Sequence, residues 1–177
     1  MYRRILVAID GSPTAACALE EALRLAKLGN ARLCLLHVVD EMKHLTGYET
    51  FTAYAHDVLP RLRAGGELVL KNAAEHATRA DVEADCALFM ASADRVCDVV
   101  VAKARSWGAD LKVIGTHGRH GLERFFLGSD AAQILRLAPV PVLLVRGGAN
   151  QPPTRTGSRT AGAGNAGLLS PGSGWKE

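Results

Sequence analysis

Short apolar runs alternate along the chain with longer segments in which apolar residues recur every three or four positions. The runs predict strands that are covered on both faces, because such strands are almost continuously apolar. The longer segments predict helices that each bury one face. This alternation is typical of an α/β fold, in which helices cover both sides of a parallel sheet. The expected strands span about residues 4–9, 32–39, 82–88, 110–114 and 140–145.

Capping residues and helix breakers mark the expected helices. Ser12 followed by Pro13 predicts a helix start, and Gly29-Asn30 predicts its end. The second helix is expected to weaken at Gly65-Gly66, because glycine has a low helix propensity. Charged residues alternate with apolar ones in the third strand, which predicts an edge position in the sheet. The expected helices span about residues 13–28, 57–77, 94–108 and 129–137.

His37 and the connection after the second strand can each be interpreted as purely structural features. His37 lies within the second strand and is interpreted as a core histidine whose ring is satisfied, not as a catalyst. Residues 41–57 form a long connection that contains Tyr48, Phe51 and Tyr54. These rings either fold over a ligand or pack the connection onto the domain, and the sequence leaves both open.

A glycine-rich segment joins the fourth expected strand to the fourth helix. Gly115, Gly118 and Gly128-Ser129 form the pattern Gly-x2-Gly-x9-Gly-Ser. Glycine lets the backbone approach a ligand closely, and the N–H groups of a helix start favour an anion. The segment therefore predicts a phosphate site, most simply for a nucleotide. A tight turn with Ser129 as the helix N-cap explains the same residues without any ligand.

Composition and charge fit one ordinary globular domain. The chain has 177 residues, of which 48% are hydrophobic and 22% are charged. The net charge of +3 is not gathered in any block, which argues against nucleic acid as a partner. The first apolar run is too short for a secretory signal or a membrane span. We therefore expect a cytoplasmic protein with no membrane partner.

The cysteines, the last strand and the tail complete the organisation. The four cysteines show no CxxC spacing and are expected to remain reduced in apolar surroundings. An exposed last strand, Val140 to Val145, would offer unpaired backbone N–H and C=O groups to another chain, so homodimerisation through it is expected. Residues 147–177 are rich in Gly, Pro, Ser and Thr, which predicts a flexible tail after a domain of residues 1–146. The cysteines are Cys17, Cys34, Cys86 and Cys97.

Four parts of the chain carry a resemblance to a known family: the glycine pattern and residues 4–12, 35–40 and 139–145. Together they resemble the nucleotide-binding branch of the universal stress protein family. The resemblance covers nearly all of residues 1–146. It implies a three-layer, doubly wound, five-stranded parallel sheet in the order 3-2-1-4-5, a Rossmann-like fold of the adenine nucleotide alpha hydrolase type. Ligands of such sheets bind at the carboxyl ends of strands where the order reverses, here between the first and fourth strands.

The resemblance also implies roles for residues at this point. Asp10 would hydrogen-bond the ribose, and Ala8 and Val38 would line the adenine slot. Val38 is equally well explained as an ordinary core residue. Phosphates would lie near the glycines, His117 and Ser129. The remaining nucleotide-binding residues are expected to be Ile114, Gly115, His117, Gly118, Gly128, Ser129 and Asp130.

Asp130 complicates the choice of ligand. Its carboxylate in the first turn of the fourth helix would repel a γ-phosphate, or would hold a magnesium ion that bridges to it. The expected ligand is therefore ATP, or else ADP or AMP, with or without Mg²⁺. No metal site built from protein groups alone is expected, because His117, His120 and Glu123 share no fixed face.

Catalytic machinery is not recognisable in the sequence. There is no GxxxxGK[ST] loop, no GxGxxG after the first strand and no GxSxG elbow, so no catalytic residue is predicted. The leading hypothesis is a nucleotide-binding regulatory protein of the stress response, with at most slow ATP hydrolysis. One alternative is a nucleotide-hydrolysing or nucleotidyl-transferring enzyme that uses His117 or His120. Another is a dimeric interaction module that works without a nucleotide.

Overall fold

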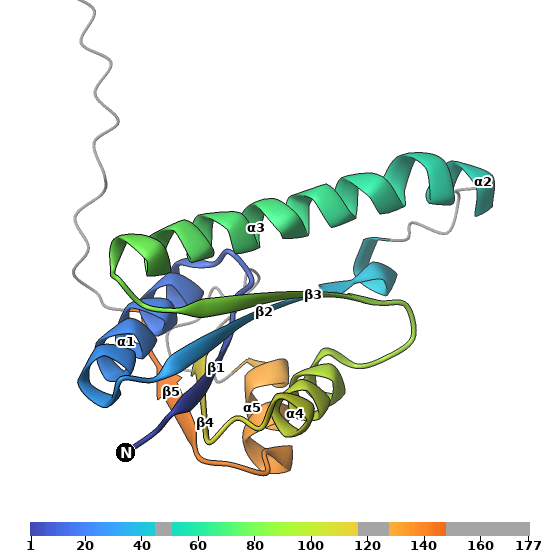
Figure 1. Cartoon of the computed structure of the whole chain (residues 1–177). Coiled ribbons are helices and arrows are strands. Elements are labelled where there is room, and N and C mark those ends of the chain that lie inside the picture. The colour runs from blue at the N-terminus through green and yellow to red at the C-terminus, as the bar shows by residue number, and fades with distance from the viewer. Residues whose placement is uncertain (45–50, 117–127, 148–177) are drawn as a thin grey trace, which may run out of the picture.

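Helices cover both faces of one five-stranded sheet in the computed structural model, which describes residues 1–44, 51–116 and 128–147 (Figure 1). The strands are all parallel and lie in the order β3-β2-β1-β4-β5, as expected. The elements are β1 (Arg4–Ala8), α1 (Pro13–Gly29), β2 (Arg32–Asp40), η1 (Glu41–His44), α2 (Phe51–Ala53), η2 (Tyr54–Val58), α3 (Leu59–Arg79), β3 (Ala84–Ala91), α4 (Val96–Trp107), β4 (Leu111–Gly115), α5 (Ser129–Leu137) and β5 (Val142–Val145).

The core consists of two apolar layers, one on each side of the sheet. The first core layer lies between the sheet and helices α1 and α3, and includes Leu19 and Leu70. The second core layer lies between the sheet and helices α4 and α5, and includes Val100 and Ile134. Figure 1 shows the two helix pairs on opposite faces. The expected three-layer architecture is therefore confirmed.

Local signals at α1 act as predicted. The Ser12 hydroxyl accepts a hydrogen bond from the Ala15 N–H at 3.1 Å, which caps the helix start. Asn30 ends the helix in the left-handed region with φ of 48°, and its N–H bonds the carbonyls of Ala26 and Lys27. The caps thereby define both ends of the first helix.

Helix α3 begins later and continues further than expected, and it runs unbroken through Gly65 and Gly66. Gly66 is buried against the sheet, where a Cβ atom would lie 2.7 Å from Leu88 Cδ1 and 3.0 Å from His37 Cδ2. A Cβ on Gly65 would meet nothing within 4 Å. Gly66 therefore allows the helix to approach the sheet closely, and the predicted weak point is a packing contact.

The edge strands differ from expectation mainly at their ends. β3 occupies one edge, as predicted, but runs from Ala84 to Ala91 and so is shifted toward the carboxyl side. β5 is shorter than expected and starts after Pro141, whose nitrogen cannot donate to a sheet ladder.

The cysteines, all of them described, form no disulfide. Cys34 and Cys97 are buried, but Cys86 is exposed, so its expected apolar environment was wrong. Cys86 lies on β3, the strand at one edge of the described sheet.

Lys112 places a charged side chain inside the second core layer. Leu111 and Val113 belong to the first core layer, so the alternation of a strand turns Lys112 to the opposite side. Its register partners there are the apolar residues Leu6 and Val142. Lys112 is 0% exposed, and its Nζ has no hydrogen-bond partner in the described part of the chain. Burial, with a smaller contribution from the positive charge of Arg105, lowers the pKa of Lys112 to about 8.

Within the described ranges, no helix is both long enough and apolar enough to span a membrane. The predicted flexible tail lies outside the described residues, apart from Gly147 at its start.

Candidate functional site

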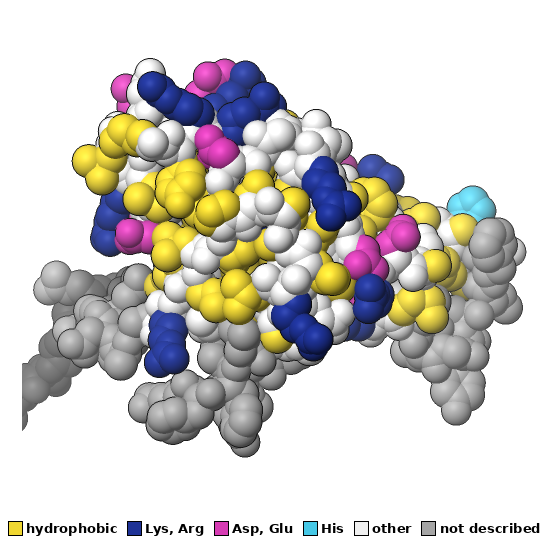
Figure 2. All heavy atoms as spheres, turned by 90° about the horizontal axis from the view of Figure 1, so that it is seen from below, with side chains coloured by type: hydrophobic (Ala, Val, Ile, Leu, Met, Phe, Trp, Pro, Cys, Tyr) yellow, Lys and Arg dark blue, Asp and Glu magenta, His cyan; other side chains and the backbone are white. Residues whose placement is uncertain are grey.

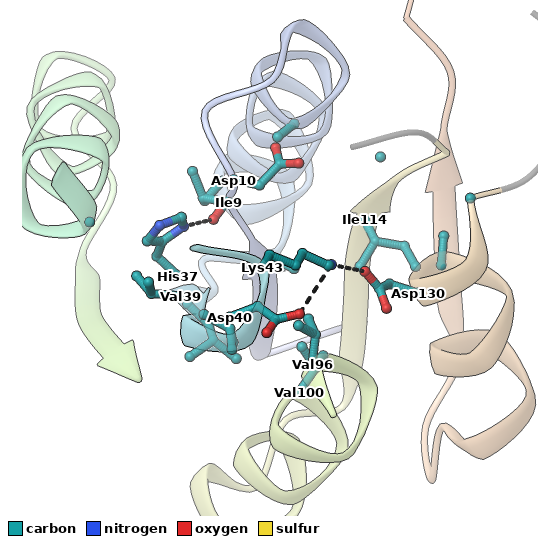
Figure 3. A pocket seen from close by; sticks show the side chains of 18 of the residues that line it. Ile9, Asp10, His37, Val39, Asp40, Lys43, Val96, Val100, Ile114 and Asp130 are labelled. Atoms are coloured by element: carbon teal, nitrogen blue, oxygen red, sulfur yellow. Dashed lines mark hydrogen bonds and ion pairs between the residues drawn. The ribbon is translucent and has the colours of Figure 1, made fainter. Parts of the chain in front are cut away.

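A cavity of about 860 Å³ opens at the carboxyl ends of β1, β2 and β4 (Figure 3). The start of α5 and parts of α3 and α4 complete its walls. Its position coincides with the reversal of strand order between β1 and β4. Open parallel sheets bind ligands at this place, and the volume suits a small molecule such as a nucleotide.

The cavity brings together every predicted site residue that the structure describes. Residues far apart in the sequence reach it because parallel strands end at one edge of the sheet. The other two predicted site residues, His117 and Gly118, lie outside the described residues. The predicted residues that line the cavity are Ala8, Asp10, Val38, Ile114, Gly115, Gly128, Ser129 and Asp130.

One side of the cavity is apolar. Ala8, Val38 and Ile114 come from three different strands, and all pack against the second core layer. Val96 and Val100 of α4 extend this wall, as Figure 3 shows. The sequence prediction missed these two valines, because their helical spacing indicated only a face packed on the sheet.

Asp10 lies directly after β1 with its carboxylate oriented by the turn that follows. Its Oδ1 accepts a hydrogen bond from the Ser12 N–H at 2.9 Å. Gly11 between them has φ of 79°, a conformation that favours glycine. The turn thus holds a carboxylate at the cavity while the next residues start α1.

Helix α5 starts one residue earlier than the N-cap interpretation required. Its N-cap is Gly128, and Ser129 is already the first helical residue, so the interpretation of Ser129 as N-cap was wrong. The Gly128 N–H donates to the Thr116 carbonyl at 2.9 Å, and its carbonyl accepts from the Ala132 N–H. Glycine has no side chain that could satisfy the N–H groups of the first turn. The helix therefore presents its amino end, with the positive end of its dipole, at the cavity.

The structure gives a packing reason for glycine at position 115 that the sequence did not reveal. A Cβ at this position would lie 3.0 Å from the Thr14 carbonyl carbon and 3.1 Å from the Thr14 oxygen. These atoms belong to the backbone of α1 and cannot turn aside as a flexible side chain can. The absence of a side chain at Gly115 therefore allows α1 to pack closely on β4, and a Cβ there would push the two elements slightly apart.

Charged side chains form the polar side of the cavity. Lys43 Nζ lies 3.2 Å from Asp40 Oδ2 and 3.7 Å from Asp130 Oδ2. Figure 3 shows Lys43 extended between the end of β2 and the start of α5. His44 and Arg61 also line the cavity. Sequence reasoning missed Lys43, His44 and Arg61, although polar residues directly after the second strand were a usable signal.

Glu41 anchors the connection that follows β2. The carboxylate is 7% exposed and accepts hydrogen bonds from the Tyr54 hydroxyl at 2.7 Å and the Ser92 hydroxyl at 3.1 Å. Burial and the adjacent carboxylate raise the pKa of Tyr54 to about 12. Tyr54 therefore bonds to Glu41 within the same connection, and the bond from Ser92 to Glu41 joins that connection to the segment after β3. These contacts favour packing on the domain for Tyr54. Tyr48 and the side chain of Phe51 lie outside the described residues.

His37 is buried and its Nδ1 forms a hydrogen bond with the Ile9 carbonyl. The interpretation of this residue as a satisfied core histidine is confirmed, although its ring also borders the cavity. Among the described residues, no group of three or more His, Cys, Asp or Glu side chains is arranged to hold a metal ion.

Comparison with known proteins decides the family. The sequence profile of the "Universal stress protein family" matches residues 1–146. The chain belongs to the universal stress protein family. A putative universal stress protein of Staphylococcus epidermidis is 35% identical over 146 residues, covering 82% of this chain and 84% of the relative.

Solved universal stress protein structures share the fold. A family member from Burkholderia pseudomallei is 36% identical, covers 81% of this chain and 95% of its own, and gives a TM-score of 0.63. A universal stress protein solved in complex with cAMP is 25% identical over 81% of this chain and 97% of its own, with a TM-score of 0.60. Structures with AMP and dAMP, at 18% and 22% identity, show likeness of fold alone.

Proposed function

We propose that this universal stress protein binds an adenine nucleotide in the cavity at the carboxyl edge of its sheet. The observation that carries the proposal is the convergence of one apolar wall, one oriented carboxylate and one helix amino end on a single cavity. These three features match the three parts of a nucleotide: a flat apolar base, a ribose with hydroxyl donors and an anionic phosphate. The relative solved with cAMP supports the same ligand class.

The base would lie against the apolar wall formed by Ala8, Val38 and Ile114. The ribose hydroxyls would donate to Asp10, which follows the end of β1 and lines the same cavity. The phosphates would lie at the amino end of α5, where Gly128 and Ser129 border the cavity. Gly115, His117 and Gly118 remain proposed contacts of the phosphates.

The number of phosphates depends on Asp130. Its carboxylate borders the cavity in the first turn of α5, beside the place proposed for phosphate. We propose ATP as the ligand, with Asp130 holding a Mg²⁺ that the phosphates also bind. If Asp130 binds no magnesium, its charge disfavours a γ-phosphate, and ADP or AMP becomes the preferred ligand.

The test is to identify what the protein carries. Freshly purified protein, prepared without added nucleotide, is denatured, and the released small molecules are identified by chromatography and mass spectrometry. Calorimetric titration with adenosine, AMP, ADP and ATP, with and without Mg²⁺, follows on nucleotide-free protein. We expect an adenine nucleotide in near-stoichiometric amount or clear binding on titration. Empty protein that binds none of the four would contradict the proposal.

A homodimer formed through β5 is proposed alongside the ligand. β5 is an apolar edge strand, paired on one side with β4. Leu135 and Leu137 of α5 are each 44% exposed. Figure 2, a view of the α4 and α5 side, shows apolar side chains spread across this face among basic ones. Light scattering at micromolar concentration should give twice the mass of the chain, and the mass of one chain would contradict the dimer.

The biological role that fits these features is regulation: the ligand would alter the shape or partner choice of a cytoplasmic dimer in the stress response. In this view residues 1–146 form the binding domain, and residues 147–177 are an appended tail.

A further inference from the structure

Lys43 is the cation that connects the two carboxylates on the polar side of the cavity. It belongs to η1, the single turn that follows β2, and its Nζ contacts Asp40 at 3.2 Å and Asp130 at 3.7 Å. Asp130 belongs to the first turn of α5, so the contact joins two separate elements across the cavity (Figure 3). An ammonium group therefore lies beside the amino end of α5.

The charges around this point would otherwise repel an anion. Asp40 and Asp130 carry two negative charges, and Asp10 adds a third to the same cavity. A carboxylate in the first turn of a helix also cancels part of the favourable dipole at its amino end. Lys43 compensates one of these charges at the point where a phosphate would approach.

The contact between Lys43 and Asp130 is also easily exchanged. The side chains of Lys43 and Asp130 are 53% and 46% exposed, and ion pairs of this kind contribute little to stability. The lysine stem is flexible and its ammonium group has three donors, so it can turn from a carboxylate to a phosphate oxygen without losing its contact with Asp40. Asp130 would then become available to solvent or to a metal ion.

We propose that Lys43 determines the preference of the site for phosphorylated ligands over the nucleoside. It neutralises Asp130 while the cavity is empty and donates to the phosphate nearest α5 when a nucleotide enters. The base and ribose contacts do not depend on it. This inference rests on the proposed nucleotide site and names the residue that makes that site selective for phosphate.

The test compares adenosine with AMP on matched variants. Calorimetric titrations use the full chain as wild type, Lys43→Met, Lys43→Arg and Lys27→Met. Lys27 lies on α1 outside the cavity lining and controls for the loss of one surface charge. Lys43→Met should weaken AMP roughly tenfold or more and leave adenosine unchanged, because one hydrogen bond to a charged group is lost. Lys43→Arg should retain most of the AMP affinity, and Lys27→Met should match the wild type.

A further variant tests the role of Asp130. Asp130→Asn should tighten AMP several-fold, and in the Lys43→Met background it should recover part of the loss, because the repelling carboxylate is gone. At ~0.5 M salt the effect of Lys43→Met should shrink, since exposed charges are screened.

The outcomes separate this inference from the proposed function. Wild type that binds none of adenosine, AMP, ADP and ATP would overturn both. If wild type binds ADP or ATP but not AMP, the same comparison of variants is made with that nucleotide. Wild type that binds both ligands, together with a Lys43→Met variant that weakens them equally or not at all, would overturn only the role of Lys43.

Discussion

Lys112 offers a strong test of how the structure determines stability. Its ammonium group lies in the second core layer with no described hydrogen-bond partner, and burial lowers its pKa from 10.5 to about 8. Each pKa unit corresponds to about 1.4 kcal/mol, so the protonated form destabilises the folded state by about 3 kcal/mol. Lys112→Met keeps a long side chain and removes the charge. We expect this variant to be more stable than wild type by about 3 kcal/mol at pH 7.

The pH dependence has a definite sign. Below pH 8 the folded and unfolded states both hold the proton, so the penalty of burial is fully present. Between about pH 8 and 10.5 the folded state releases the proton first, and wild type gains stability. The advantage of Lys112→Met should therefore be greatest at pH 7 and should shrink by about 3 kcal/mol as the pH rises to about 10.5.

Urea unfolding of both proteins at several pH values between about 7 and 10.5 measures this difference. The difference is the useful quantity, because Cys34, with a pKa raised to about 11, also titrates in alkali and affects both proteins alike. At pH 7 the urea midpoint should rise by roughly 1–2 M for a slope near 2 kcal/mol/M. Lys27→Met, a change of an exposed lysine, should move it little. A Lys112→Met variant that is no more stable than wild type at pH 7, or whose advantage is constant with pH, would refute the reasoning.

Two further changes test the packing of α3 and the anchor at Glu41. Gly66→Ala should destabilise the protein relative to Gly65→Ala by about 1–3 kcal/mol, because only the Cβ on Gly66 meets the sheet. Equal thermal midpoints for the two variants would contradict this. Gly65→Ala alone should stabilise by up to about 1 kcal/mol through helix propensity. Tyr54→Phe should lower the free energy of unfolding by about 1 kcal/mol, since one of two hydrogen bonds to Glu41 is lost; unchanged stability in denaturant would show that this bond contributes nothing.

The sequence allowed the fold and part of the lining of the candidate site to be predicted, because both depend on regular patterns. Strand positions followed from apolar runs, and the order of the sheet followed from the family resemblance. What escaped prediction depends on contacts between distant segments. Lys43 and Asp130 meet only when η1 and α5 come together, and Lys112 looks like an ordinary lysine until α4 and α5 cover its strand.

The same limit applies to the glycines. The sequence indicates that Gly66 weakens a helix, but only the folded structure shows that it lies against His37 and Leu88. The span of α5 was predicted correctly, but its N-cap was not: Ser129 is a good N-cap by residue type, whereas the geometry gives that position to Gly128.

The contact between Gly115 and the backbone of Thr14 bears on how mutational scans of this protein should be interpreted. A side chain at position 115 would strain the packing of α1 on β4 even if no ligand ever entered the cavity. Intolerance at this glycine would therefore include a cost to the assembly of the domain and could not be assigned to phosphate binding alone. Positions such as Ser129 and Lys43, which border the cavity without bringing two backbones into contact, would report on the ligand itself.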